Sequence, residues 1–162
     1  MQMITLQDVY DAFLSKVNDD DWSSAYNEED IMYFLKDWRS ILNSALPYFN
    51  FPKCSLEIDE KNQCFVDSKM TQREVQILAV YMKQEWLKRT IDSWENIKTQ
   101  YEEKDFSQAN LLKVFISLRE QAKEEALILE RKYYRSINNR PFKYSDMAGG
   151  GSHVRGRVPR KL

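Results

Sequence analysis

The chain has 162 residues, of which 43% are hydrophobic and 30% charged, and its formal net charge is −1. This length allows one domain with a hydrophobic core and is too short for two domains of ordinary size. No run approaches the roughly 18 consecutive apolar residues of a membrane span, and the N-terminus lacks the pattern of a signal peptide, so we expect a soluble protein made in a cytosol and no membrane partner. The 13% aromatic content with only four Gly and four Pro favours long regular elements and a mainly α fold.

Two helices are predicted in the first third of the chain. Thr5 and Asp8 resemble a capping pair, and apolar residues recur at helical spacing over residues 6–17. A second apolar-periodic stretch covers residues 31–45 and follows an acidic first turn, which favours a helix N-terminus. Pro47 is expected to end this second helix.

The period of the pattern changes to about two over residues 54–67, which predicts one short β-hairpin. With the turn at residues 61–62, Ile58 would pair with Phe65. A two-stranded hairpin is marginal by itself, so it must pack on helices or on the strand of a partner.

Two long helices are predicted after the hairpin. Thr71 and Glu74 form a capping box, which opens a helix expected to run to about Tyr101. Ser107 is the expected cap of a last helix that extends to about Ile137. Joined by a short polar turn, the two helices should form an antiparallel pair, each roughly 45 Å long, and this pair would be the scaffold of a helical bundle.

The first of these long helices carries apolar residues on two sides, which predicts a central position in the fold. Other helices would cover one side, and more core or another subunit would cover the second. The two stripes are Val75, Leu78, Met82 and Trp86, and Leu87, Ile91, Trp94 and Tyr101.

Charge divides the chain into a helical domain, residues 1–139, and an extended basic C-terminal arm, residues 140–162. The domain has 18 Lys and Arg against 24 Asp and Glu, a balance of −6, whereas the arm has 6 against 1, a balance of +5. Such an arm suits either an acidic protein surface, for example that of a neighbouring copy, or nucleic acid phosphates. We prefer the protein surface, because the acidic domain offers it in every copy. The candidate partner-binding residues of the arm are Arg140, Phe142, Tyr144, Arg155, Arg157, Arg160 and Lys161.

No catalytic constellation is present in the sequence, so we expect no enzyme, no cofactor and no metal. The single histidine, His153, lies in the arm, and the acidic run at residues 19–21 lacks the spacing of a Ca²⁺ loop. Cys54 and Cys64 have no partners at zinc-ligand spacing, and the hairpin register does not favour a disulfide between them. The four tryptophans are expected in the core or at an interface, and Lys88 and Arg89 near Trp86 give only a faint pattern for stacking on nucleic acid bases.

The order of elements over about residues 55–134 resembles that of the head-to-tail connector proteins, also called adaptor or head-completion proteins, of tailed bacteriophages. The resemblance is carried by the hairpin, by TQRE leading into ILAVYMKQEWLKR, and by FSQANLLK. It implies a small, mainly helical protein that forms a ring beneath the twelve-fold portal, extends the DNA channel and presents a platform for the tail. It also implies a C-terminal segment that contacts the portal or adjacent subunits, although the glycine-rich spacer and the basic end leave open whether this arm touches protein or DNA.

The sequence therefore favours a structural virion protein of the phage neck, assembled in the host cytoplasm. Its expected partners are the portal protein, neighbouring copies of itself, further neck or tail proteins and, in passing, DNA in the channel. The alternative is a small helical module that binds nucleic acid nonspecifically through Arg155, Arg157, Arg160 and Lys161.

Overall fold

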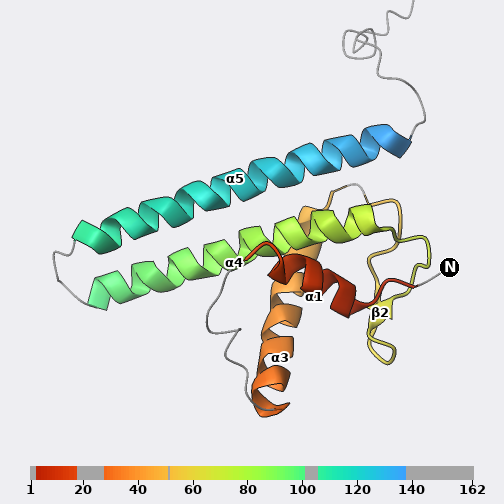
Figure 1. The fold of residues 1–162 in the computed structure, drawn as a ribbon, viewed down its shortest axis with the longest axis horizontal. Helices are drawn as coiled ribbons and strands as arrows, with labels where there is room; N and C mark the ends of the chain where they lie inside the picture. The colour runs from red at the N-terminus through yellow and green to blue at the C-terminus, as the bar shows by residue number, and fades with distance from the viewer. Residues whose placement is uncertain (1–2, 18–27, 51, 101–105, 138–162) are drawn as a thin grey trace, which may run out of the picture.

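The fold is mainly α-helical with one short antiparallel hairpin, as predicted (Figure 1). The structure is a computed structural model that describes residues 3–17, 28–50, 52–100 and 106–137. Its elements, in chain order, are α1 (Leu6–Leu14), α3 (Glu28–Ala45), the 3₁₀ helix η1 (Leu46–Tyr48), β1 (Ile58–Asp59), β2 (Cys64–Phe65), α4 (Gln72–Gln100) and α5 (Phe106–Ile137).

The long helices α4 and α5 lie side by side and antiparallel, which confirms the predicted scaffold (Figure 1). They contain 29 and 32 residues, so each is about 45 Å long. Ala122 and Ala126 of α5 are fully buried. Small side chains at these positions let the two helix backbones approach each other closely.

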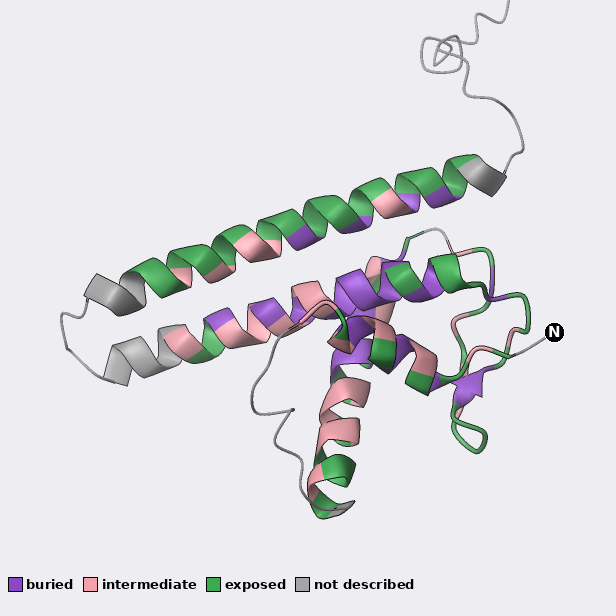
Figure 2. Ribbon diagram, in the orientation of Figure 1, coloured by how far each residue is buried: buried purple, intermediate pink, exposed green. Residues whose placement is uncertain are grey.

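Helix α4 is the centre of the fold, because α1, α3 and α5 all pack on it. Figure 2 shows buried residues along much of α4, whereas most of α5 is exposed. Both predicted stripes of α4 contribute to the buried interior, although Trp86 and Trp94 are only half-buried and Tyr101 lies outside the described residues. The fully buried members are Val75, Leu78, Met82 and Leu87, and Ile91 is nearly so.

The first helix begins as its sequence predicts. Thr5 and Asp8 form a capping box in which the Thr5 backbone N–H donates to the Asp8 carboxylate at 2.7 Å and the Asp8 N–H donates to the Thr5 hydroxyl at 3.2 Å. The helix ends at Leu14, earlier than the apolar pattern suggested. Beyond Leu14, the backbone N–H groups of Lys16 and Val17 each donate to the carbonyl of the residue three positions earlier, so the chain continues as a tighter turn.

The boundaries of the other helices follow local chemistry, with one correction. The Glu74 carboxylate accepts the backbone N–H of Thr71 at 2.8 Å, and α4 begins at Gln72, directly after Thr71. Helix α3 gives way to η1 just before Pro47, which has no N–H to continue an α-helix. The expectation that Ser107 caps the last helix is wrong, because α5 already begins at Phe106 and Ser107 lies in its first turn.

The hairpin has the predicted register, since Ile58 pairs with Phe65. Its ladder is only two residues long on each strand, and the chain's own N-terminal segment supports it. The Phe65 N–H donates to the Ile4 carbonyl at 3.2 Å, and the Leu6 N–H donates to the Gln63 carbonyl at 2.9 Å. The extended residues before α1 therefore lie along β2, and this pairing occupies backbone groups that a free hairpin edge would expose.

Both cysteines are buried and neither forms a disulfide, as the register predicted. The base of the hairpin is instead closed by Asp67. Its carboxylate accepts the backbone N–H of Ser55 at 3.0 Å and that of Lys69 at 2.9 Å.

Candidate interaction surfaces

Three buried carboxylates in the α4 and α5 region each accept a hydrogen bond from a tyrosine hydroxyl. We call these six residues the Tyr–Glu network. Tyr133 donates to Glu74 at 2.6 Å, Tyr81 donates to Glu130 at 2.7 Å, and Tyr48 donates to Glu85 at 3.1 Å. The first two bonds run in opposite senses between α4 and α5, so each helix supplies one donor and one acceptor to the other.

The Tyr–Glu network also holds the segment that connects α3 to the hairpin. The Asn50 backbone N–H donates to Glu130 at 2.8 Å, and the Lys53 N–H donates to the Tyr133 hydroxyl at 3.1 Å. The Cys54 thiol lies 3.8 Å from Glu74 and contributes a weak hydrogen bond. Backbone groups of this irregular segment are thereby satisfied by buried side chains, which fixes its path across the end of the helix pair.

The hydroxyls of Tyr81 and Tyr133 and the thiol of Cys54 are held in their protonated, neutral forms. Burial raises the pKa of Tyr81 and that of Tyr133 well above the usual range, and the carboxylate that each hydroxyl contacts raises it further. Burial, followed by the negative charge of Glu74, raises the pKa of the Cys54 thiol to about 11. At neutral pH these groups serve as hydrogen-bond donors in the core and are poorly suited to acid–base or nucleophilic chemistry.

Arg89 fixes α3 against α4. Its guanidinium donates to the Ser40 hydroxyl at 3.2 Å and to the Ser44 hydroxyl at 3.1 Å, and it lies 3.6 Å from the Asp37 carboxylate. The sequence offered Lys88 and Arg89 near Trp86 as a faint nucleic-acid pattern. In the structure the Arg89 guanidinium contacts α3, and binding of nucleic acid by this pair stays a prediction.

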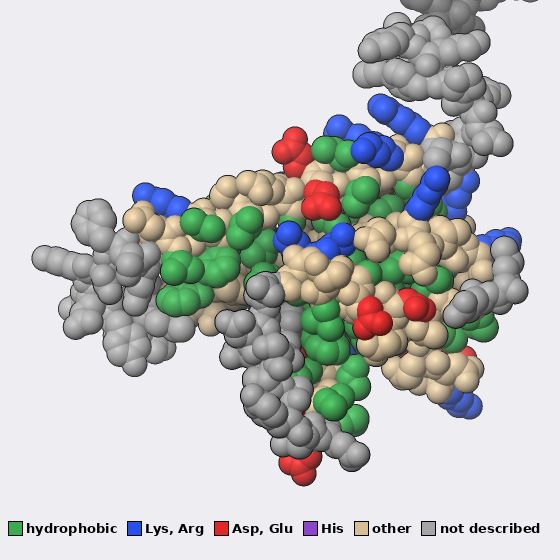
Figure 3. Space-filling view, viewed as in Figure 1, with side chains coloured by type: hydrophobic (Ala, Val, Ile, Leu, Met, Phe, Trp, Pro, Cys, Tyr) green, Lys and Arg blue, Asp and Glu red, His purple; other side chains and the backbone are tan. Residues whose placement is uncertain are grey.

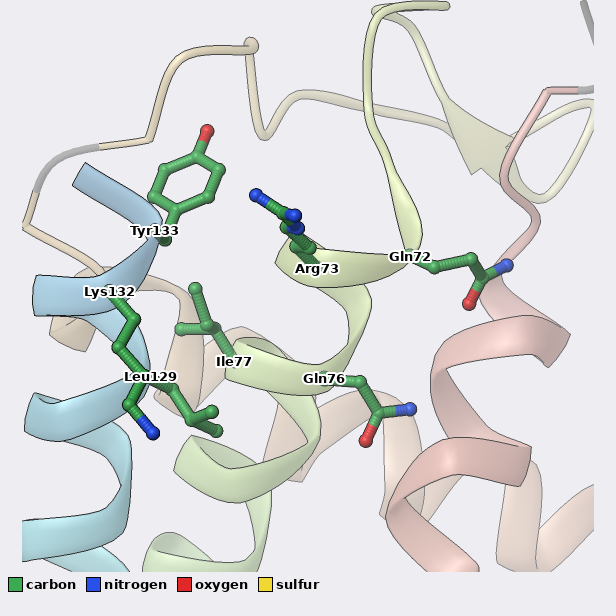
Figure 4. A pocket seen from close by; sticks show the side chains of 7 residues that line it. All are labelled: Gln72, Arg73, Gln76, Ile77, Leu129, Lys132 and Tyr133. Carbon is green, nitrogen blue, oxygen red and sulfur yellow. The ribbon is translucent and has the colours of Figure 1, made fainter. Parts of the chain in front are cut away.

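A groove of about 530 Å³ lies where the start of α4 meets the end of α5 (Figure 4). Ile77 and Leu129 are its apolar lining, and Arg73 and Lys132 supply positive charge, while the Tyr133 ring stands at its end. Gln72 and Gln76 complete the lining. An apolar groove with cationic neighbours can bind a partner's side chain, and nothing in this set of residue types provides a nucleophile with an adjacent base.

Large apolar side chains are also exposed on two helices. On α3 they occupy the N-terminal half, which projects away from the α4 and α5 pair (Figures 1 and 2). On α5 they are spread along the length of the helix. The exposed large apolar residues of these helices are Ile31, Met32 and Tyr33 on α3, and Leu111, Val114, Ile116, Leu127, Ile128 and Tyr134 on α5.

Positive side chains gather over the C-terminal end of α5, as Figure 3 shows. Arg131, Lys132 and Arg135 occupy the last turns of this helix. They precede the basic arm in the chain, and their positive charge attracts a negatively charged partner to this end of the molecule.

All candidate partner-binding residues of the arm lie outside the described residues, as do His153 and the acidic run at residues 19–21. The structure therefore leaves their assignment as a prediction. Sequence reasoning missed the Tyr–Glu network entirely. The signal that could have suggested it is the placement of Glu130 and Glu85 within apolar stretches of two helices, where a carboxylate needs a donor.

Within the described ranges, no group of three or more His, Cys, Asp or Glu side chains is arranged to hold a metal ion. None of the helices that the structure describes has both the length and the apolar character to cross a membrane. No family model, no curated protein and no solved structure matches the chain.

Proposed function

We propose that this protein is a structural component of the neck of a tailed bacteriophage, where copies form a ring adaptor between the portal and the tail. The observation that carries the proposal is the position of α5. This 32-residue helix packs on α4 and leaves Leu127, Ile128 and Tyr134 exposed on its outer surface. Contiguous exposed apolar side chains favour a protein–protein interface.

The construction of the domain suits a rigid part of an assembly. The Tyr–Glu network connects α4 and α5 by directional bonds in a buried setting, so the helix pair resists sliding. A rigid scaffold loses little conformational freedom when it binds, which favours assembly. In this proposal the domain supplies the ring wall and the arm, residues 140–162, contacts the portal or an adjacent copy.

The test is the molar mass of the protein by light scattering, alone and mixed with the portal protein of its own genome. We expect the full-length chain to form a portal-bound ring, and the chain shortened to residues 1–139 to bind far less of the portal. Absence of any complex with the portal at micromolar concentration would overturn the assignment to the neck.

A second function, nonspecific binding of nucleic acid, has one specific observation in its favour. The cluster of Arg131, Lys132 and Arg135 continues the positive charge of the arm onto the domain. If this charge binds phosphates, retention on DNA should fall steeply, by roughly 10³-fold or more for six or so phosphate contacts, between about 50 and 200 mM salt.

The two functions are separated by one variant. Replacing Arg155, Arg157, Arg160 and Lys161 with Gln should abolish DNA retention if the arm tracks phosphates, while leaving oligomers intact. If the arm instead contacts protein, the same variant loses portal-bound rings, and the wild-type chain shows little DNA retention.

A further inference from the structure

Helices α3 and α5 carry the same four-residue pattern on their outer surfaces: an acidic residue, two apolar residues three and four positions later, and a basic residue seven positions later. Residues with this spacing share one face of a helix. We call them the α3 stripe, which consists of Glu29, Met32, Tyr33 and Lys36, and the α5 stripe, which consists of Glu124, Leu127, Ile128 and Arg131.

Both stripes are exposed over their whole length. Tyr33 is 70% exposed and Met32 is 56% exposed, and these are the two most exposed large apolar side chains of the described residues. In the α5 stripe Ile128 is 41% exposed and Leu127 is 38% exposed. Both apolar pairs therefore leave contact area that the chain itself does not use.

The two stripes lie on opposite sides of the molecule, so one chain cannot pair them with each other. Figure 1 shows α5 on one side of α4 and the N-terminal half of α3 projecting from the other side. The α5 stripe faces away from α4, because α5 turns Ala122 and Ala126 toward the interior.

We propose that the α3 stripe of one copy packs antiparallel against the α5 stripe of a second copy. In this register Glu29 faces Arg131 and Lys36 faces Glu124, so both ends of the contact join opposite charges. The apolar pairs, Met32 with Tyr33 and Leu127 with Ile128, meet between them. A parallel arrangement would oppose Glu29 to Glu124 and is disfavoured by like-charge repulsion.

The hollow beside the α5 stripe favours this contact over one between two α5 stripes. A hollow of about 250 Å³ borders the α5 stripe and is lined by Leu127, Arg131 and Tyr134, with Asn50, Glu130 and Arg135. The protruding Tyr33 ring of the second copy fits such a hollow, with its apolar body inside and its hydroxyl at the rim. Two α5 stripes facing each other would leave both hollows unfilled.

This inference rests on the proposed function, since it names the surfaces through which copies join in a ring. A contact between two different surfaces is heterologous, and repeating it around an axis generates a ring when the rotation closes. Each added copy then presents one unused α3 stripe and one unused α5 stripe until closure.

The experiment uses two full-length variants, each with one stripe disabled. The α3-stripe variant is Met32→Asp with Tyr33→Asp, and the α5-stripe variant is Leu127→Asp with Ile128→Asp. All four positions are exposed, so folding should be preserved, and circular dichroism checks this. Val114→Asp, at an α5 residue that is 55% exposed and outside the stripe, is the matched control.

Light scattering at rising concentration should show oligomers for the wild-type chain and for the Val114→Asp control. Each stripe variant alone should be monomeric, and a 1:1 mixture should form dimers and nothing larger, because only one intact α3 stripe and one intact α5 stripe remain per pair. A single charge reversal, Glu29→Arg or Arg131→Glu, should weaken association by roughly tenfold, and combining both reversals in one chain should restore it.

Several outcomes overturn the proposal. The first is a wild-type chain that stays monomeric at about 1 mM, where even a weak specific contact is populated. The second is that the stripe variants assemble like the wild type. The third is that the α3-stripe variant still dimerises while the α5-stripe variant does not. Portal binding is measured separately on the same proteins. If the chain associates through the stripes but does not bind the portal, the stripe contact is supported and the neck function is overturned. If both stripe variants still form portal-bound rings, the neck function is supported and the stripe contact is overturned.

Discussion

At the scale of single residues, the most consequential feature is the Tyr–Glu network. A carboxylate buried beside apolar side chains destabilises a fold unless it receives hydrogen bonds. Glu74, Glu85 and Glu130 are each less than 8% exposed, and each accepts a tyrosine hydroxyl. The network therefore favours one alignment of the helices over neighbouring ones, because a shift along the axis would leave the carboxylates without donors.

Replacing Tyr133 with Phe should destabilise the protein by about 1–3 kcal/mol. The change removes the hydroxyl that donates to Glu74 and accepts the Lys53 N–H, so it leaves a buried carboxylate short of a donor and a backbone N–H without its acceptor. Urea unfolding monitored by circular dichroism measures the effect. The matched control is Tyr33→Phe, at an exposed tyrosine, which should change stability by less than about 0.5 kcal/mol. Equal stability of both variants would contradict the structural role of the network.

Asp67 should make the stability of the hairpin region depend on pH. The backbone N–H of Lys69 has the largest effect in holding the pKa of Asp67 below its usual range, and the backbone N–H of Ser55 lowers this pKa further. Because the folded-state pKa is lowered, the stabilisation is complete above the unfolded-chain pKa of roughly 4 and is lost as the pH falls below it. Asp67→Asn should therefore be less stable than the wild type at pH 7, and the difference should shrink at about pH 2.5.

Urea midpoints at the two pH values measure this difference, with Glu57→Gln, a change at another exposed carboxylate of the hairpin region, as the control. A difference between wild type and Asp67→Asn that stays constant from pH 7 to pH 2.5 would show that the Asp67 charge does not stabilise the folded state.

At the scale of elements, the boundaries that local chemistry determines were predicted well. The capping box at Thr5, the start of α4 after Thr71 and the break at Pro47 each depend on a side chain that acts within four residues. The hairpin register followed from alternation together with the turn placed at residues 61–62. The predicted start of α5 was wrong because local sequence does not always determine a boundary. A residue such as Ser107 can be a cap or a first-turn residue, and the local sequence supports both.

The closeness of α4 and α5 gives a prediction for Ala126, which is fully buried between them. Ala126→Leu should destabilise the fold by about 1–3 kcal/mol, because the added side chain must separate the helices or adopt a strained rotamer. Thermal unfolding measures the loss. Glu125→Leu adds a similar side chain at an exposed neighbouring position and should have little effect. If Ala126→Leu is as stable as Glu125→Leu, the helices are not closely packed at this point.

At the scale of the whole molecule, the folded domain and the arm should be separable. Among the residues that the structure describes, the buried core lies between Leu6 and Tyr133, and the arm has too little apolar content to add a core of its own. Deleting residues 140–162 should therefore leave the thermal midpoint within roughly 2 °C of that of the full chain, a change that corresponds to less than about 1 kcal/mol. Differential scanning calorimetry measures this. A drop of 10 °C or more would mean that the arm packs on the domain and would contradict the division at residue 139.

The sequence by itself determined the mainly helical class, the long antiparallel pair, the hairpin register and the absence of a disulfide. Each depends on periodicity or on contacts between residues close in the chain, and such contacts are encoded in short windows. The opposite charges of the domain and the arm are likewise readable from composition, and they are the basis for expecting a binding arm.

Only the tertiary structure decided which polar residues are buried and which apolar residues are not. Glu130 is buried because α5 lies against Tyr81 of α4, and Tyr33 is exposed because the end of α3 projects beyond the helix that would cover it. The helical pattern of a single segment cannot distinguish these cases, since burial depends on where the neighbouring elements end. For the same reason, the matching stripes on α3 and α5 gain meaning only when both are seen to be exposed and to lie on opposite sides of one molecule.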